Sequence, residues 1–244
     1  MTQFSQKSLD FIQRASRQKR EDWLDRNRPE YEKLLVEPLR ELMTRMEKSF
    51  RKDALGYRFP TRSLARLKRS ADRAKAQGWY KDWLGAMVTR DSGSRYEDLP
   101  NLYFHLSFDD VFSAGGLYMP SARQTKQIRA WIDQDPSLLF SLLQDREFKG
   151  RFKDLGDERV LKTKPRNYSA DHPRIEFLRM TGWYVWRPIP KRVLFSSHLA
   201  DHLEADWRQV LRLNQVLDHY TQHWPTERAS EADDIRAPQV NWDE

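Results

Sequence analysis

The sequence contains no cysteine. Disulfide bonds, thiolate nucleophiles and cysteine-ligated zinc or iron–sulfur sites are therefore excluded. No run of residues approaches the roughly 18 apolar positions of a membrane-spanning helix. The opening residues, MTQFSQKSLDFIQRAS, also lack the apolar core of a secretory signal peptide. These absences predict a cytoplasmic protein that is not inserted in a membrane.

Aromatic residues are abundant by contrast. They make up 12% of the 244 residues and include nine Trp, which argues against a chain that is disordered throughout. A chain of this length fits one large domain. We therefore predict a single domain over residues 1–225. Few core-forming residues follow Trp224, so we expect the acidic tail at 226–244 to be disordered.

Positive charge is concentrated between Arg58 and Lys81. Eight Lys and Arg residues in this segment face only Asp72, which gives a net charge of +7, equal to the formal charge of the whole chain. The tail from Thr226 to Glu244 has six acids against two Arg, for a net charge of −4. Such a basic segment favours anionic partners, and an acidic tail can shield it or stay solvated.

The periodicity of apolar residues predicts an α+β fold, with a mostly antiparallel central sheet flanked by N-terminal and C-terminal helices. Helices are expected at 8–16, from Asn27 with an interruption at Pro38, after the cap Ser121, after Asp135-Pro136 and at 197–220. Strands are expected at 84–89, 102–108, 110–114 and 183–189, with Gly115-Gly116 forming a turn. Residues 63–77 fit an amphipathic helix, although an extended conformation is the alternative.

Four stretches carry a resemblance to a known family. They are Trp23-x3-Asn27-x3-Tyr31-x6-Pro38-Leu39, the basic segment from Arg66 through Tyr80-Lys81 to Val88, Gly116-Leu117-Tyr118-Met119-Pro120, and Leu161-x3-Pro165-Arg166-x5-His172-Pro173-x4-Leu178-Arg179. In order and spacing they resemble an uncharacterised family, the domain of unknown function numbered 2461, over roughly residues 8–220. The basic stretch is the most divergent, because the family's Asp, Arg and Phe after Arg69 are replaced by Ser70, Asp72 and Arg73. The resemblance implies the fold and the general location of a site but no reaction.

The residues that match the family also supply candidates for anion binding. Arg offers bidentate donors and Lys a point charge for phosphate or carboxylate. The predicted ligand-binding residues are Arg69, Tyr80, Lys81, Arg166 and Arg179. His172 is a weak catalytic candidate, since it can act as a general acid or base near neutral pH or can simply pack beside Pro173. A structural role is favoured for His105.

Other motifs are poorer candidates. His198 and His202 are one helical turn apart, but no third ligand is evident, so no metal site is predicted. Gly115-Gly116 lacks the spacing of a nucleotide-binding loop.

Three functions remain open at this point. The leading hypothesis is a basic pocket that binds an anionic or phosphorylated small molecule, in an enzyme or a binding protein. The alternatives are a nucleic-acid-binding module that uses residues 58–81, and a protein-interaction or scaffold subunit. The sequence indicates no cofactor, no reaction and no oligomeric state.

Overall fold

A five-stranded antiparallel sheet forms the centre of the molecule, in the order β1-β2-β3-β4-β5. The structure is a computed structural model that describes residues 3–54, 56–61, 66–90, 99–156 and 158–223. The strands are β1 (Tyr57–Arg58), β2 (Trp83–Arg90), β3 (Asn101–Ser107), β4 (Val111–Leu117) and β5 (Trp183–Pro188). With helices on either side of the strands in sequence, the fold is α+β, as predicted. The acidic tail at 226–244 lies outside the described residues.

The register of the strands defines two ends of the sheet. At one end Trp83 pairs with Ser107 of β3, and Phe112 of β4 pairs with Pro188 of β5. We call this the Trp83 end. At the other end Leu117 pairs with Trp183, the first residue of β5. We call this the Trp183 end. The two ends are separated by the length of the strands, at about 3.4 Å per residue.

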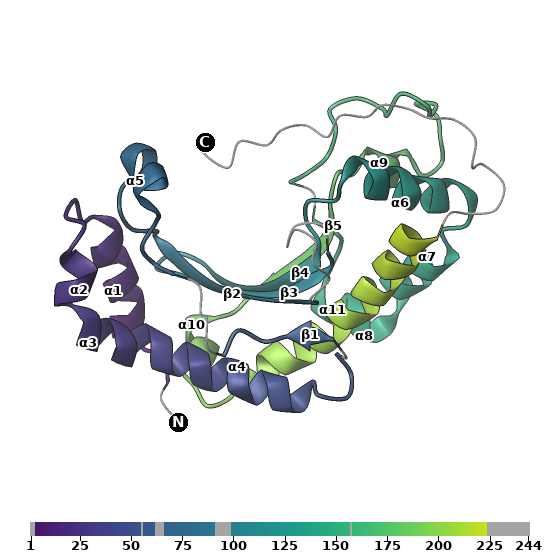
Figure 1. Cartoon of the computed structure of the whole chain (residues 1–244). Helices are drawn as coiled ribbons and strands as arrows, with labels where there is room; N and C mark the ends of the chain where they lie inside the picture. Colours follow the sequence, from purple (N-terminus) through teal and green to yellow (C-terminus); the bar gives the residue numbers. More distant parts are fainter. Residues whose placement is uncertain (1–2, 55, 62–65, 91–98, 157, 224–244) are drawn as a thin grey trace.

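One face of the sheet is packed against helices. Strand β2 turns Leu84, Ala86 and Val88 to this face, where they are buried. Helix α11 (Leu199–Gln222) crosses it along β4, while α4 (Glu37–Ser49) and α10 (Lys191–Leu194) lie on the same, convex side (Figure 1). Gly115 allows the close approach of α11, because a Cβ there would lie 2.5 Å from Cγ1 of Val210. Burial of these apolar side chains supplies most of the stability of the fold.

The prediction of a turn at Gly115-Gly116 was wrong. Both glycines lie inside β4 and pair with β5. The missing side chain of Gly115 serves helix packing, which sequence composition alone does not distinguish from a turn. The flanking residue Gly116 has a φ of +117°, a conformation that glycine adopts readily.

The N-terminal helices lie along one side of the molecule. They are α1 (Gln6–Ser16), α2 (Trp23–Arg26), α3 (Arg28–Tyr31), the π-helical stretch η1 (Glu32–Val36) and α4. The predicted interruption at Pro38 is confirmed, since η1 ends two residues before this proline. Proline lacks the N–H that a continuous α-helix needs, and a π-bulge relieves the mismatch.

The basic segment is partly extended and partly helical. Lys68 forms an antiparallel bridge with Tyr80, and helix α5 (Ala71–Gln77) lies between them. The helix ends at Gly78, as predicted, with a φ of +79°. Each of the two conformations considered from the sequence therefore holds for part of the segment, while residues 62–65 lie outside the described residues.

The remaining helices lie toward the Trp183 end (Figure 1). They are α6 (Ala122–Gln134), α7 (Ser137–Gln144), α8 (Arg146–Arg151) and α9 (Ile175–Arg179). Ser121 caps α6 as predicted, with its hydroxyl accepting from the Gln124 N–H at 3.3 Å. Helix α9 begins at Ile175, two residues after Pro173. Across the described ranges, no helix is long and apolar enough to cross a membrane.

Candidate functional site

Among the described residues, the helices α4, α10 and α11 lie on the convex side of the sheet and leave the concave face open (Figure 1). Residues paired across an antiparallel sheet point to the same face, and residues two apart on one strand also share a face. Met87, Tyr103, Ala114 and Trp186 form one such row across four strands. Met87 and Trp186 are among the most exposed large hydrophobic residues, at 41% and 47%. The face is therefore accessible as well as apolar.

A second row lies beside the first, toward the Trp83 end. His105 of β3 stacks on Phe112 of β4 with ring centroids 4.5 Å apart and planes within 9°. Trp83 lies on the other side of His105 at 5.6 Å, and Trp186 meets Phe112 edge-on at 6.0 Å. These contacts connect rings from all four long strands. We call the set Trp83, Met87, Tyr103, His105, Phe112 and Trp186 the aromatic face.

Tyr103 and His105 share a hydrogen bond within this face. The Tyr103 hydroxyl lies 3.1 Å from Nδ1 of His105. Burial lowers the pKa of His105 to about 4, although Asp110 and Asp82 act in the opposite direction. Burial also raises the pKa of Tyr103. Both side chains are consequently neutral at pH 7, and the structural role predicted for His105 is that of a ring in a stacked row.

Lys81 lies at the border of the aromatic face. Its ammonium group is 4.1 Å from the centroid of the Trp83 ring, within the range of a cation–π interaction. Burial lowers the pKa of Lys81, and the positive charges of Arg69 and Arg73 lower it further. An anion bound beside Lys81 would stabilise its charged form, because it would offset the repulsion among the three cations.

Arg69 and Tyr80 bind the backbone of their own chain. Nη1 of Arg69 donates to the carbonyl oxygens of Gln77 and Gly78, each at 3.3 Å, and to that of Tyr80. The Tyr80 hydroxyl is buried, donates to the Glu21 carbonyl at 2.6 Å and accepts from the Leu24 N–H at 3.0 Å. These two residues fix the loop around α5 and join it to α2.

Arg179 has a similar role at the other side of the molecule. It donates from Nε to the Leu161 carbonyl at 2.8 Å and from Nη2 to the Lys162 carbonyl at 3.3 Å. Its Nη1 lies 3.5 Å from a carboxylate oxygen of Glu176. Arg166, in the same region, is exposed.

His172 uses both ring nitrogens in contacts with its own chain. Nδ1 accepts from the Arg174 N–H at 3.1 Å, and Nε2 lies 3.0 Å from Oδ1 of Asp133. Since Nδ1 accepts, the proton lies on Nε2 and is donated to Asp133. This arrangement joins the turn before α9 to α6, so the packing alternative accounts for His172.

The predicted site residues fall into two separate groups. Lys81 lies two residues before the Trp83 end of β2, and Arg179 lies four residues before the Trp183 end of β5. Figure 1 shows α5 and α9 at opposite sides of the molecule. Arg69, Tyr80 and Lys81 thus lie around α5, whereas Arg179 ends α9, His172 lies in the turn before α9, and Arg166 lies in the segment between α8 and α9. The structure does not bring all of them into one pocket.

His198 and His202 also point to different surroundings. His198 is exposed, whereas Nε2 of His202 lies 3.3 Å from Nη1 of Arg187 and 3.6 Å from Asp206. In the part of the chain that the structure describes, no group of three or more His, Asp or Glu side chains has the arrangement of a metal site.

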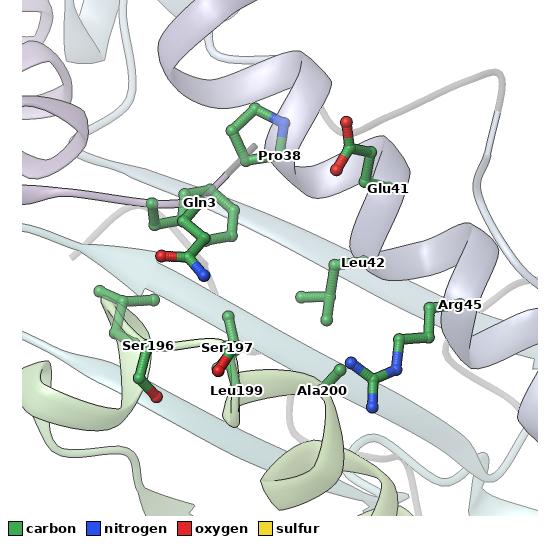
Figure 2. A pocket seen from close by; sticks show the side chains of 11 residues that line it. Gln3, Pro38, Glu41, Leu42, Arg45, Ser196, Ser197, Leu199 and Ala200 are labelled. Carbon is green, nitrogen blue, oxygen red and sulfur yellow. The ribbon is translucent and has the colours of Figure 1, made fainter. Parts of the chain in front are cut away.

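A small pocket lies on the helix-covered side, between α4 and α11 (Figure 2). Its volume is about 50 Å³, far below the roughly 300–1,000 Å³ of pockets that bind small molecules. Arg45 of α4 forms an ion pair with Asp201 of α11 beside it. The other side chains that line it are mainly apolar, among them Pro38, Leu42, Leu194 and Leu199. The pocket is too small to hold a ligand of ordinary size.

Sequence reasoning missed most of the aromatic face. Phe112, Met87 and Trp186 were not singled out from the sequence, where they occur within apolar strands. The available signal was the alternation in 102–108, where Tyr103 and His105 share one side. Recognising the face also requires knowing that no helix covers that side, and this follows only from the tertiary structure.

Comparison with known proteins identifies a family. The family model described as "Conserved hypothetical protein (DUF2461)" matches residues 7–215. No curated protein and no solved structure matches the chain. The match covers most of the sequence and includes the four stretches singled out above, so the chain belongs to this family.

Proposed function

We propose that the protein binds, on the aromatic face, a ligand that joins a planar ring system to an anionic group, such as a phosphorylated nucleoside. The observation that carries the proposal is the position of Lys81, whose ammonium lies over Trp83 where the basic segment meets the aromatic face. In this arrangement Lys81 holds the anionic group. The planar group stacks on the rings of the aromatic face, of which Trp186 is the most exposed.

Both the planar ring and the anionic group of such a ligand would contribute favourably to binding. A ring that stacks on the aromatic face removes exposed apolar surface from water, and aromatic stacking contributes roughly 1–3 kcal/mol for each base. An anion beside Lys81 also relieves the repulsion from Arg69 and Arg73, which lowers the pKa of this lysine. The ligand class that satisfies both conditions has a ring and a phosphate in one molecule.

The choice of Lys81 over the other predicted cations follows from the geometry. Arg69 and Arg179 donate to backbone carbonyl oxygens of their own chain, and Arg166 lies in the segment between α8 and α9. Lys81 lies next to the aromatic face and is half-buried. The proposal therefore retains the anionic ligand inferred from the sequence but replaces the five-residue pocket with a single cation and a ring-binding surface.

The test is a binding panel read by intrinsic tryptophan fluorescence. Nucleoside monophosphates, flavin mononucleotide and pyridoxal phosphate are compared with their unphosphorylated counterparts and with inorganic phosphate. We expect at least one phosphorylated member to bind about tenfold more tightly than its unphosphorylated counterpart, because one charge-assisted contact is worth 1.5–3 kcal/mol. Absence of binding by every member, or equal binding with and without phosphate, contradicts the proposal.

A single-stranded nucleic acid is the second candidate, since the aromatic face spans four strands and has room for more than one base. Sheet faces with exposed aromatic residues bind successive bases by stacking. This candidate predicts that a short single-stranded oligonucleotide binds more tightly than any mononucleotide and loses affinity steeply as salt rises. If the oligonucleotide binds no better than its mononucleotide, the small-molecule ligand is retained.

A further inference from the structure

A fully buried carboxylate lies on the other side of the sheet. Asp206 of α11 is 0% exposed, and its Oδ2 accepts from the Ser113 hydroxyl of β4 at 2.6 Å. Its Oδ1 accepts from Nη1 of Arg151, the last residue of α8, at 2.9 Å and from Nη1 of Arg187 of β5 at 2.8 Å. Two guanidinium groups from separate elements are thus held by one oxygen, within two hydrogen-bond lengths of each other.

The charges in this cluster do not balance. Two arginines share the single negative charge of Asp206. His202 adds no negative charge and accepts from Nη1 of Arg187 through Nε2 at 3.3 Å, since arginine can only donate. Burial lowers the pKa of His202, and Arg187 and Arg151 lower it as well, against the opposite effect of Asp206. The cluster therefore carries one excess positive charge with a neutral imidazole beside it.

Neighbouring acids on α11 do not supply the missing charge, because each has another cationic partner. Asp201 pairs with Arg45 of α4. Glu204 pairs with Arg208 at 2.7 Å. On α8, Glu147 accepts from the side-chain amide of Gln209 at 3.3 Å, and its charge helps to raise the pKa of Arg212. Within the described ranges, Asp206 is the carboxylate that contacts Arg151 and Arg187.

The side chains of the two arginines remain partly exposed. The side chains of Arg151 and Arg187 are 33% and 32% exposed. Their contacts among the described residues use only the Nη1 atoms, whereas each guanidinium has five N–H donors. Free donors remain on both groups, and the shared carboxylate fixes their positions before any ligand arrives.

We propose that Arg151 and Arg187 form a phosphate-binding site that is separate from the aromatic face, with buried Asp206 as the anchor that orients them. Paired arginines with fixed guanidinium planes match the tetrahedral oxygens of a phosphate group. His202, beside them, has an imidazole that can take up a proton when an anion binds. The ligand is inorganic phosphate or a phosphate group carried by a small molecule.

The experiment measures phosphate affinity by calorimetry and by the guanidinium Nε–Hε signals of Arg151 and Arg187 in NMR spectra. Sodium phosphate is compared with sodium chloride at equal ionic strength, and glycerol phosphate is titrated in parallel to distinguish free from carried phosphate. The variant Arg151→Gln removes the excess charge. The matched control is Arg212→Gln on α11, because Arg212 pairs with Asp145 at 2.8 Å and lies outside the cluster.

We expect Arg151→Gln to lose about tenfold in phosphate affinity, while Arg212→Gln stays within about twofold of the unaltered protein. Lys81→Gln should not change phosphate affinity here, which separates this site from the proposed function. If phosphate binds no better than chloride, or if Arg151→Gln and Arg212→Gln have equal affinities, the site is only a structural ion-pair cluster and the proposal is wrong.

Discussion

Arg69 donates from Nη1 to the carbonyl oxygen of Tyr80, and the hydroxyl of Tyr80 in turn joins α2 through the Leu24 N–H. Two residues of the family's basic stretch therefore hold the chain together around α5. Their matching positions in the family are explained by this structural role, and Lys81 next to them is left as the cation that borders the aromatic face.

Replacing Tyr80 with Phe tests this structural role. The change removes the hydroxyl and leaves the buried Leu24 N–H without its acceptor, so the free energy of unfolding should fall by about 1–3 kcal/mol. Urea denaturation followed by circular dichroism gives the value. Ligand affinity on the aromatic face should stay within about twofold, because the hydroxyl points away from that face toward α2.

The control is Tyr184→Phe, whose hydroxyl donates to the exposed Glu158 carboxylate at 3.3 Å. Because water can solvate the exposed Glu158 carboxylate in its place, we expect loss of this hydrogen bond to cost only about 0.5–1 kcal/mol. If both variants lose the same stability, the buried hydroxyl of Tyr80 does not have the role described here.

Gly115 should tolerate no larger side chain. A Cβ at this position lies 2.5 Å from Cγ1 of Val210, so Gly115→Ala must push α11 away from β4. Overpacking of this kind costs about 1–3 kcal/mol, measured as a lower midpoint of urea denaturation.

Gly150 is the matched comparison, since it lies in α8 with nothing within 4 Å of an added Cβ. Gly150→Ala should be neutral or raise stability by about 0.5–1 kcal/mol, because Ala restricts the unfolded chain and favours helix. Equal effects at the two positions would show that α11 does not approach β4 as closely as described.

The stability of the protein should fall with acidification because of His105. Its pKa is lowered from 6.5 to about 4 in the folded state. Between these values the unfolded chain binds a proton that the folded protein does not, so stability is present above pH 6.5 and decreases as pH falls toward 4. The loss has an upper bound of about 3 kcal/mol, which solvent screening reduces.

His105→Gln should reduce this pH dependence. Urea denaturation at pH 7.5, 6 and 5 compares the variant with the unaltered protein, so that the contribution of His202, whose pKa is also lowered, cancels. A difference between the two proteins that does not change with pH would mean that His105 is not buried in the stacked row.

The sequence was sufficient for the element pattern because that pattern depends on local residues. The cap Ser121 and the alternation of Leu102, Phe104 and Leu106 predicted a helix and a strand that the structure confirms. Gly115-Gly116 failed as a predictor because glycine at a close helix contact looks the same in sequence as glycine in a turn.

The site was harder to predict for a different reason. Resemblance to a family's basic residues indicates candidate anion-binding cations. It does not show which of them donate to backbone carbonyl oxygens instead, as Arg69 and Arg179 do. The separation of Lys81 from Arg179 follows from the strand register, and the sequence does not specify this. The exposed position of Trp186 likewise depends on the absence of a helix over the concave face.

Trp186→Ala should weaken ligand binding without a large loss of stability. Its ring is 47% exposed, so truncation removes little buried surface, yet it deletes the largest accessible ring of the aromatic face. We expect a loss of about fivefold to a hundredfold in affinity, the range of one stacking contact. The measurement is calorimetric titration with the panel member that binds most tightly. Unchanged affinity would show that Trp186 is not part of the ring-binding surface.

The most direct test of the account compares Lys81→Gln with Lys75→Gln in the same titration. Both variants remove one positive charge from the basic segment, but the Lys75 side chain on α5 is 81% exposed and pairs with Asp72. If Lys81 holds the anionic group, its variant loses about tenfold in affinity while Lys75→Gln loses less than about twofold. Equal affinities for the two variants would contradict the proposed site.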